Sequence, residues 1–190
     1  MVEMDSEKEQ IIENAVKEIL TAIGEDPERT GLLETPKRVA KMYQEIFSGL
    51  MTPAFDDYKL FDSKNEDDMV LVKNIQFYSM CEHHLLPFYG KVHLAYVPAG
   101  GKVIGLSKIP RLVDYCSKRP SVQEDLTVMI AEKLAANIPN QGIAIAIEAE
   151  HMCMTIRGAK TPHSLTKTYH YTGIFKEDRD WKQDFLQALK

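Results

Sequence analysis

The sequence lacks any apolar run long enough to cross a membrane and any stretch dominated by basic residues. Its 190 residues carry 23 Lys and Arg against 28 Asp and Glu, which gives a formal net charge of −5. A spanning helix needs about 20 consecutive apolar residues, so membrane insertion is not expected. Without a Lys/Arg stripe, nonspecific binding to nucleic acid is not expected either. Residues 1–10 are polar and acidic, unlike a secretory signal, which predicts a cytoplasmic protein.

Cysteine is also scarce, with three residues in the whole chain. An odd number of cysteines cannot all pair within one chain, and a reducing compartment leaves them as thiols. The hydrophobic fraction of 44% and the charged fraction of 27% are typical of a soluble globular protein with a real core. The thiols are therefore expected to be available to a metal ion.

Residues 1–50 carry two helical patterns. Ser6 followed by Glu9 matches a capping box, and apolar residues recur at helical spacing as far as Gly24. A second helix is expected to start with Thr35 as N-cap and Pro36 at its first position. The two helices are predicted to form an antiparallel pair. Residues 51–68 are turn-rich and acidic, which indicates a mobile connection.

Residues 69–190 predict an α+β domain of the order β-β-α-α-β-β, with helices covering one face of the sheet. Residues 99–102, Ala-Gly-Gly-Lys, are typical of a hairpin turn leading into Val103 and Ile104. Strand composition predicts strands at 69–78, 90–97, 142–148 and 164–172. Helical spacing of apolar residues predicts helices at 107–117, 121–137 and 180–189.

The strongest chemical signal is the pair Cys81 and His84, together with a distant Cys153. A thiolate and an imidazole three positions apart bind zinc from one turn, and folding can add a second thiolate. Three protein ligands indicate catalytic zinc with an open position, whereas structural zinc normally has four. His83, His151 or Cys116 can supply a fourth ligand and close the site. Of these, Cys116 lies on the apolar face of a predicted helix, which favours a core position.

Three further residues beside this group suit proton transfer and substrate binding. His83 and His151 each lie within two positions of a predicted ligand, and imidazole both delivers and accepts protons near neutral pH. The alternative role for either histidine is to orient a metal ligand. Glu124 completes a capping box with Ser121, so it either closes a helix start or accepts two hydrogen bonds from an amidine edge such as that of guanine.

Several cations lie near these segments in the sequence. Ser107, Lys108 and Arg111 open a predicted helix, whose amino end attracts anions, and Arg157 follows Cys153 closely. Each cluster taken alone is typical of a solvated surface, but beside a metal site it suggests phosphate binding, since guanidinium groups match phosphate oxygens. Arg38 on the second helix is open to the same two interpretations.

The sequence resembles a known family, GTP cyclohydrolase I, in five segments that follow the same order and extend over most of the chain. The similar segments are Glu34–Met42, Ser79–His84, Gly105–Ile109, Arg119–Glu124 and His151–Gly158. The resemblance implies the tunnelling fold, in which β-β-α-α-β-β units form pentameric barrels and two pentamers stack into a homodecamer. It also implies conversion of GTP to 7,8-dihydroneopterin triphosphate with release of formate, the first step of tetrahydrofolate or tetrahydrobiopterin biosynthesis.

The resemblance assigns a role to each candidate residue. It places zinc on Cys81, His84 and Cys153, and guanine on Glu124. The proton-transfer and sugar-rearrangement residues that it implies are His83, His151 and Ser107. The triphosphate ligands that it implies are Lys108, Arg111, Arg157 and, from a neighbouring subunit, Arg38.

Two other functions remain open from the sequence. One is a nucleotide-binding module without catalysis, in which His83 or His151 closes a structural zinc site. The other is a tunnelling-fold enzyme that acts on a pterin or a deazaguanine. Glu124 suits that second function as well, but Lys108 and Arg157 then lack a triphosphate.

Overall fold

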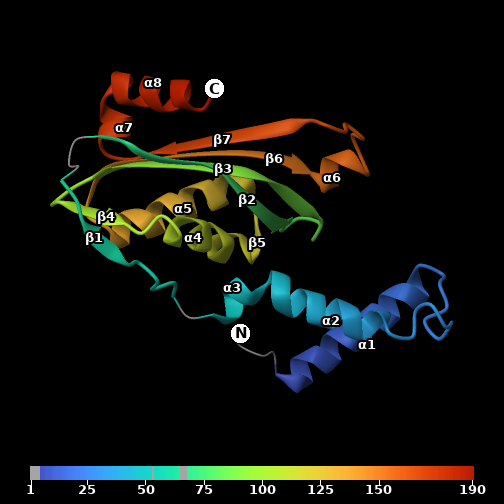
Figure 1. Ribbon diagram of the computed structural model, residues 1–190. Helices are drawn as coiled ribbons and strands as arrows, with labels where there is room; N and C mark the ends of the chain where they lie inside the picture. The colour runs from blue at the N-terminus through green and yellow to red at the C-terminus, as the bar shows by residue number, and fades with distance from the viewer. Residues whose placement is uncertain (1–4, 53, 65–67) are drawn as a thin grey trace. The chain divides into compact units, whose positions relative to one another are not determined.

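The computed structural model describes residues 5–52, 54–64 and 68–190 of the chain (Figure 1). The chain divides into two compact units, residues 1–53 and 54–190. Among the described residues, no helix combines the length and the apolar character needed to cross a membrane.

The N-terminal unit contains helices α1 (Ser6–Ala22), α2 (Thr35–Ile46) and α3 (Ser48–Met51), and α1 packs against α2 as predicted. The predicted helix starts were wrong by one residue. Asp5, and not Ser6, caps α1, because its carboxylate accepts a hydrogen bond from the Glu7 amide. Thr35 is already helical and Glu34 precedes it without a side-chain cap, while Pro36 lies in the first turn.

The C-terminal unit is built on a five-stranded sheet of the order β5-β2-β3-β6-β7. Three strands have twelve residues each: β2 (Val70–Cys81), β3 (Pro87–Pro98) and β6 (Asn140–His151). β7 (Leu165–Tyr171) pairs with β6, and the short β5 (Pro120–Ser121) runs parallel to the end of β2. All other pairs in this sheet are antiparallel.

Helices α4 (Lys108–Ser117) and α5 (Gln123–Asn137) cover one face of the sheet, as predicted, and enclose the larger core. Figure 1 shows α7 (Ile174–Glu177) and α8 (Arg179–Ala188) on the opposite face. There Phe175 and Phe185 pack on small residues of β3 and β6, such as Ala95 and Ala144. The expected α+β class and β-β-α-α-β-β order are confirmed, and the C-terminal helices add cover to the second face.

The turn at residues 99–102 is present, with positive φ angles at Gly100 and Gly101. The following strand β4 (Lys102–Ile104), however, does not extend the main sheet. It pairs with β1 (Leu60–Asp62), which lies in the segment predicted as an irregular connection. β1 and β4 form a separate two-stranded sheet beside the start of α4.

Candidate metal and substrate site

The predicted metal ligands come together because β3 pairs with both β2 and β6. The register places Ser79 of β2 and His151 of β6 on either side of Phe88 in β3. The ends of β2 and β6 therefore lie one strand apart. Cys81 is the last residue of β2, and Cys153 lies in the short helix α6 (Met152–Thr155) directly after β6.

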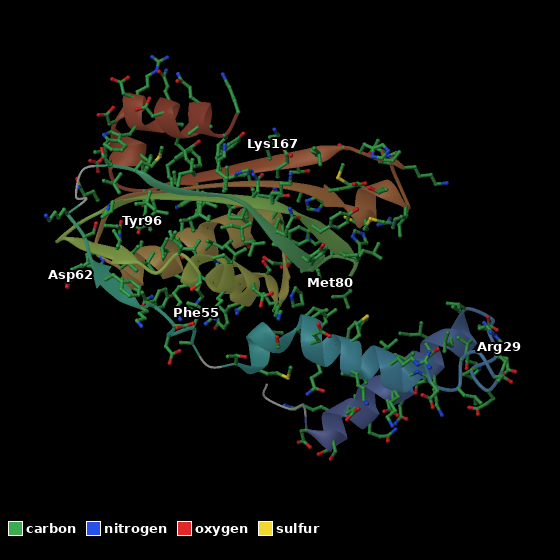
Figure 2. The ribbon with its side chains drawn as sticks, in the orientation of Figure 1. Arg29, Phe55, Asp62, Met80, Tyr96 and Lys167 are labelled. Atoms are coloured by element: carbon green, nitrogen blue, oxygen red, sulfur yellow. The ribbon has the colours of Figure 1, made fainter. Side chains whose placement is uncertain are left out.

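The turn after β2 presents His84 to the same point. The Cys81 carbonyl accepts hydrogen bonds from the amides of His84 and Leu85, and the Cys81 amide donates to the Leu86 carbonyl. Leu85 has a φ angle of 50°, so the chain reverses tightly here without glycine. In Figure 2, the Met80 label marks this end of β2.

The ligand atoms of Cys81, His84 and Cys153 all lie within 4.8 Å of one another. Two thiols and one imidazole are a soft donor set that suits zinc, and a small contraction brings them to the roughly 3.5–4 Å separations of a tetrahedral site. Burial and the neighbouring Cys81 raise the pKa of the Cys153 thiol, and Arg157 opposes this rise. A divalent cation favours both thiolates and offsets their mutual repulsion. The three residues can therefore bind a metal.

The three candidates for a fourth ligand differ in their surroundings. Cys116 is fully buried on the core side of α4, as predicted, and burial raises its pKa to about 12. His83 is exposed, with Nδ1 3.9 Å from the Cys81 sulfur and Nε2 3.9 Å from the Glu82 carboxylate. His151 is turned to a different partner.

His151 is held by two contacts. Its ring stacks on Phe88 with 4.8 Å between the centroids and 3° between the planes. Its Nε2 atom lies 2.7 Å from Oε1 of Gln123. Burial lowers the pKa of His151, and the negative charge of Glu124 partly opposes this shift. His151 therefore has a fixed orientation beside the metal group.

Gln123, which the sequence analysis missed, determines the tautomer of His151. Its amide nitrogen donates to the carbonyls of Ile147 and Thr166 and to the Thr168 hydroxyl, at 3.0–3.2 Å. Because carbonyls only accept, the amide oxygen must face His151, and Nε2 of His151 must carry the proton. The Nδ1 atom of the neutral ring is then the acceptor. In the sequence, Gln123 is marked only by being a polar residue at a position that belongs to the apolar stripe at the start of a helix.

Glu124 lies in the first turn of α5 and is exposed. The capping box predicted for it was wrong, because Val122 is the N-cap and no side chain caps this helix. The Ser121 hydroxyl instead donates to the Val122 carbonyl. The Glu124 carboxylate influences His151 electrostatically, so this exposed side chain lies at the metal end of the unit.

The cations divide between the two ends of α4. Arg157 influences the Cys153 thiol and so belongs to the metal end. Lys108 and Arg111 lie in the first turn of α4, after Ser107. The other end of α4 leads into β5, where Ser121 pairs with Cys81. Ten helical residues span about 15 Å, so one chain keeps Lys108 well away from its own metal group.

Arg38 is an exposed residue of α2 in the N-terminal unit, and its role stays a prediction. The structure also reveals a residue that the sequence analysis did not single out. Asp57 binds both Lys108 and Arg111. Its only sequence signal is an acidic pair, Asp56 and Asp57, set between two aromatic residues.

Comparisons with known proteins give the following similarities. Residues 12–190 match the family model described as GTP cyclohydrolase I. The GTP cyclohydrolase 1 of Enterococcus faecalis is 69% identical over 98% of this chain and 100% of its own length. The GTP cyclohydrolase 1 of Lactiplantibacillus plantarum is 55% identical over 98% of each chain. Among solved structures, an archaeosine synthase QueF-like protein in its apo form is 19% identical, with a TM-score of 0.44 over 55% of this chain and 93% of its own. The match over residues 12–190 and the two full-length relatives show that this chain belongs to the GTP cyclohydrolase I family.

Proposed function

We propose that this chain is a zinc-dependent enzyme that converts GTP to 7,8-dihydroneopterin triphosphate and releases formate. The observation that supports this best is the group Cys81, His84 and Cys153, flanked by His151 and Glu124, in a member of the GTP cyclohydrolase I family. The reaction would be the first step of tetrahydrofolate or tetrahydrobiopterin biosynthesis, in the cytoplasm, where the cysteines stay reduced.

The proposed chemistry begins at the imidazole part of guanine. Cys81, His84 and Cys153 would hold zinc, which when bound would supply an acidified water for hydrolysis. Glu124 accepts hydrogen bonds from the ring N–H and the amino group of guanine, which orients the ring. His151 can take a proton from the attacking water at Nδ1 while Gln123 accepts a hydrogen bond from Nε2, and either His151 or the exposed His83 delivers a proton to N7 of guanine as the five-membered ring opens. Ser107 takes part in the later rearrangement of the sugar.

The triphosphate is proposed to bind Lys108, Arg111 and Arg157, with Arg38 from a neighbouring subunit. Such remote binding positions the guanine ring without touching the reacting atoms. Since α4 separates Lys108 and Arg111 from the metal end of their own chain, we assign them to the metal group of an adjacent copy. The site then requires a homo-oligomer.

Open sheet edges support this assembly, which we propose to be a decamer of two pentamers. β7 ends the sheet on one side, and β5 covers only Met80 and Cys81 of β2 on the other. Among the described residues, the outer edges of β7 and most of β2 therefore have unpaired backbone groups. Exposed Tyr78 and Tyr169 lie on these two strands. Pairing β2 of one copy with β7 of the next would join copies head to tail, the kind of contact that builds a closed ring when the rotation between copies divides a full turn.

The test of the function is incubation with GTP, followed by detection of formate and of a fluorescent pterin after oxidation. Replacing Cys153 with Ala is expected to remove bound zinc and to lower product formation by at least about a thousandfold, because the metal site loses a ligand. Cys116→Ala is the matched control, since it removes a thiol from the core. Activity of Cys153→Ala at the wild-type level would contradict the metal assignment.

Chelation separates this function from the structural zinc alternative. Removal of metal is expected to abolish product formation while the circular dichroism spectrum and the unfolding temperature change little. A structural site, by contrast, would lose its fold with its metal.

A further inference from the structure

Asp57 occupies the point where two proposed triphosphate ligands converge. One carboxylate oxygen lies 2.5 Å from Nζ of Lys108, and the other lies 2.8 Å from a guanidinium nitrogen of Arg111. Lys108 and Arg111 are three positions apart on α4, so they project from the same face of the helix. A carboxylate that bridges two cations in this way has the shape and charge of one edge of a phosphate group.

The segment that carries Asp57 is anchored on both sides. Phe55 packs against Tyr58 and Tyr115, with ring centroids 5.0 and 5.6 Å apart, and both Phe55 and Tyr58 contact the core. The Tyr58 hydroxyl donates to the Lys133 carbonyl, and the Gly105 amide donates to the Lys59 carbonyl. The position of Asp57 over the first turn of α4 is therefore set by the fold and not by the ion pairs alone.

The charge of Asp57 is maintained at neutral pH. Lys108 first, and then Arg111, hold the pKa of its carboxyl below its usual range. The side chains of Lys108, Asp57 and Arg111 are 16%, 37% and 61% exposed, so the ion pair between Asp57 and Arg111 is the one that meets water. Ion pairs of this kind are weak and are readily exchanged for a ligand with more negative charge.

We propose that Asp57 is a specificity-determining residue. Its carboxylate pairs with Lys108 and Arg111, and a polyphosphate chain displaces it from these cations whereas a single phosphate does not. A triphosphate carries several charges and reaches further cations, so it displaces one carboxylate. Inorganic phosphate or a nucleoside monophosphate brings little more negative charge to Lys108 and Arg111 than the Asp57 carboxylate does, so it does not displace that carboxylate. This inference rests on the proposed function, because it takes Lys108 and Arg111 as triphosphate ligands.

The test compares Asp57→Asn with Asp56→Asn in the complete oligomer. Both changes remove one negative charge from neighbouring positions, but Asp56 is exposed, whereas Asp57 forms the ion pairs with Lys108 and Arg111. Calorimetric titration would measure binding of inorganic triphosphate and of inorganic phosphate. Asp57→Asn is expected to bind triphosphate about threefold to tenfold more tightly and to lower the KM for GTP by a similar factor. Its preference for triphosphate over phosphate should fall, while Asp56→Asn should match the wild type.

Unchanged or weaker triphosphate binding by Asp57→Asn would overturn the proposal, since a residue that only orients the cations would give that result. Asp57→Ser provides the same measurement if the Asn variant does not fold. Calorimetry with inorganic triphosphate does not depend on turnover, so the outcome is distinct from that of the GTP assay. Pterin formation without an effect at Asp57 would reject only this inference.

Discussion

At the scale of single residues, a substitution at Glu124 distinguishes a role in substrate binding from a role in helix stability. The N-cap of α5 is Val122, and Glu124 makes no capping hydrogen bond, so its carboxylate is available for a ligand. Glu124→Gln is expected to weaken binding of guanine nucleotides by at least about tenfold, because an amide cannot accept two hydrogen bonds from the guanine edge. Competition binding of GTP and ATP and urea unfolding would measure the two effects. Equal weakening for both nucleotides, or a loss of about 1 kcal/mol in the free energy of unfolding, would favour the capping role.

The same scale shows which parts of the site the sequence could predict. Cys81 and His84 are close in sequence and carry distinctive chemistry, so their spacing was informative. Gln123 is different, because its partners Thr166 and Thr168 lie on β7, more than forty residues away, and only the fold brings them together. Asp57 is likewise functional only through its contacts with α4. Residues whose role depends on distant partners leave little trace in a local pattern.

At the scale of helices and strands, the type of each element was predicted better than the residues at which it begins and ends. The capping interpretations of Ser6, Thr35 and Ser121 were wrong because several polar residues at each helix start can cap, and backbone geometry selects among them. The strand predicted at 69–78 continues to Cys81, since pairing with β3 and β5 extends it through polar Ser79. β1 was missed because three residues give no periodic signal, and its partner β4 lies about forty positions later.

Strands β3 and β6 approach each other closely at Gly90. Gly90 of β3 lies opposite Ala149 of β6, and a Cβ atom at Gly90 would lie 1.9 Å from the Glu148 carbonyl oxygen. Gly90→Ala should therefore force β3 and β6 apart and lower the free energy of unfolding by about 2–3 kcal/mol. Urea unfolding at a fixed protein concentration would measure this. Gly31→Ala is a control, since only the mobile end of Arg29 lies near that position. Equal stability of both variants would contradict this account of the strand contact.

At the scale of the whole molecule, the separation of the two halves of the proposed site along α4 predicts complementation between inactive variants. Cys153→Ala lacks the metal end, and Arg111→Ala lacks the cation end. If adjacent subunits supply the two ends, an oligomer coexpressed from equal amounts of both variants contains intact sites at about a quarter of its positions. GTP turnover by oligomers purified through two different affinity tags should then rise well above that of either variant alone, towards about a quarter of the wild-type rate. If each chain instead builds its whole site, every site in the mixture carries one defect, and turnover stays at the level of the single variants. Recovery would therefore show that α4 of one chain lies at the metal group of an adjacent chain, as the proposed assembly requires.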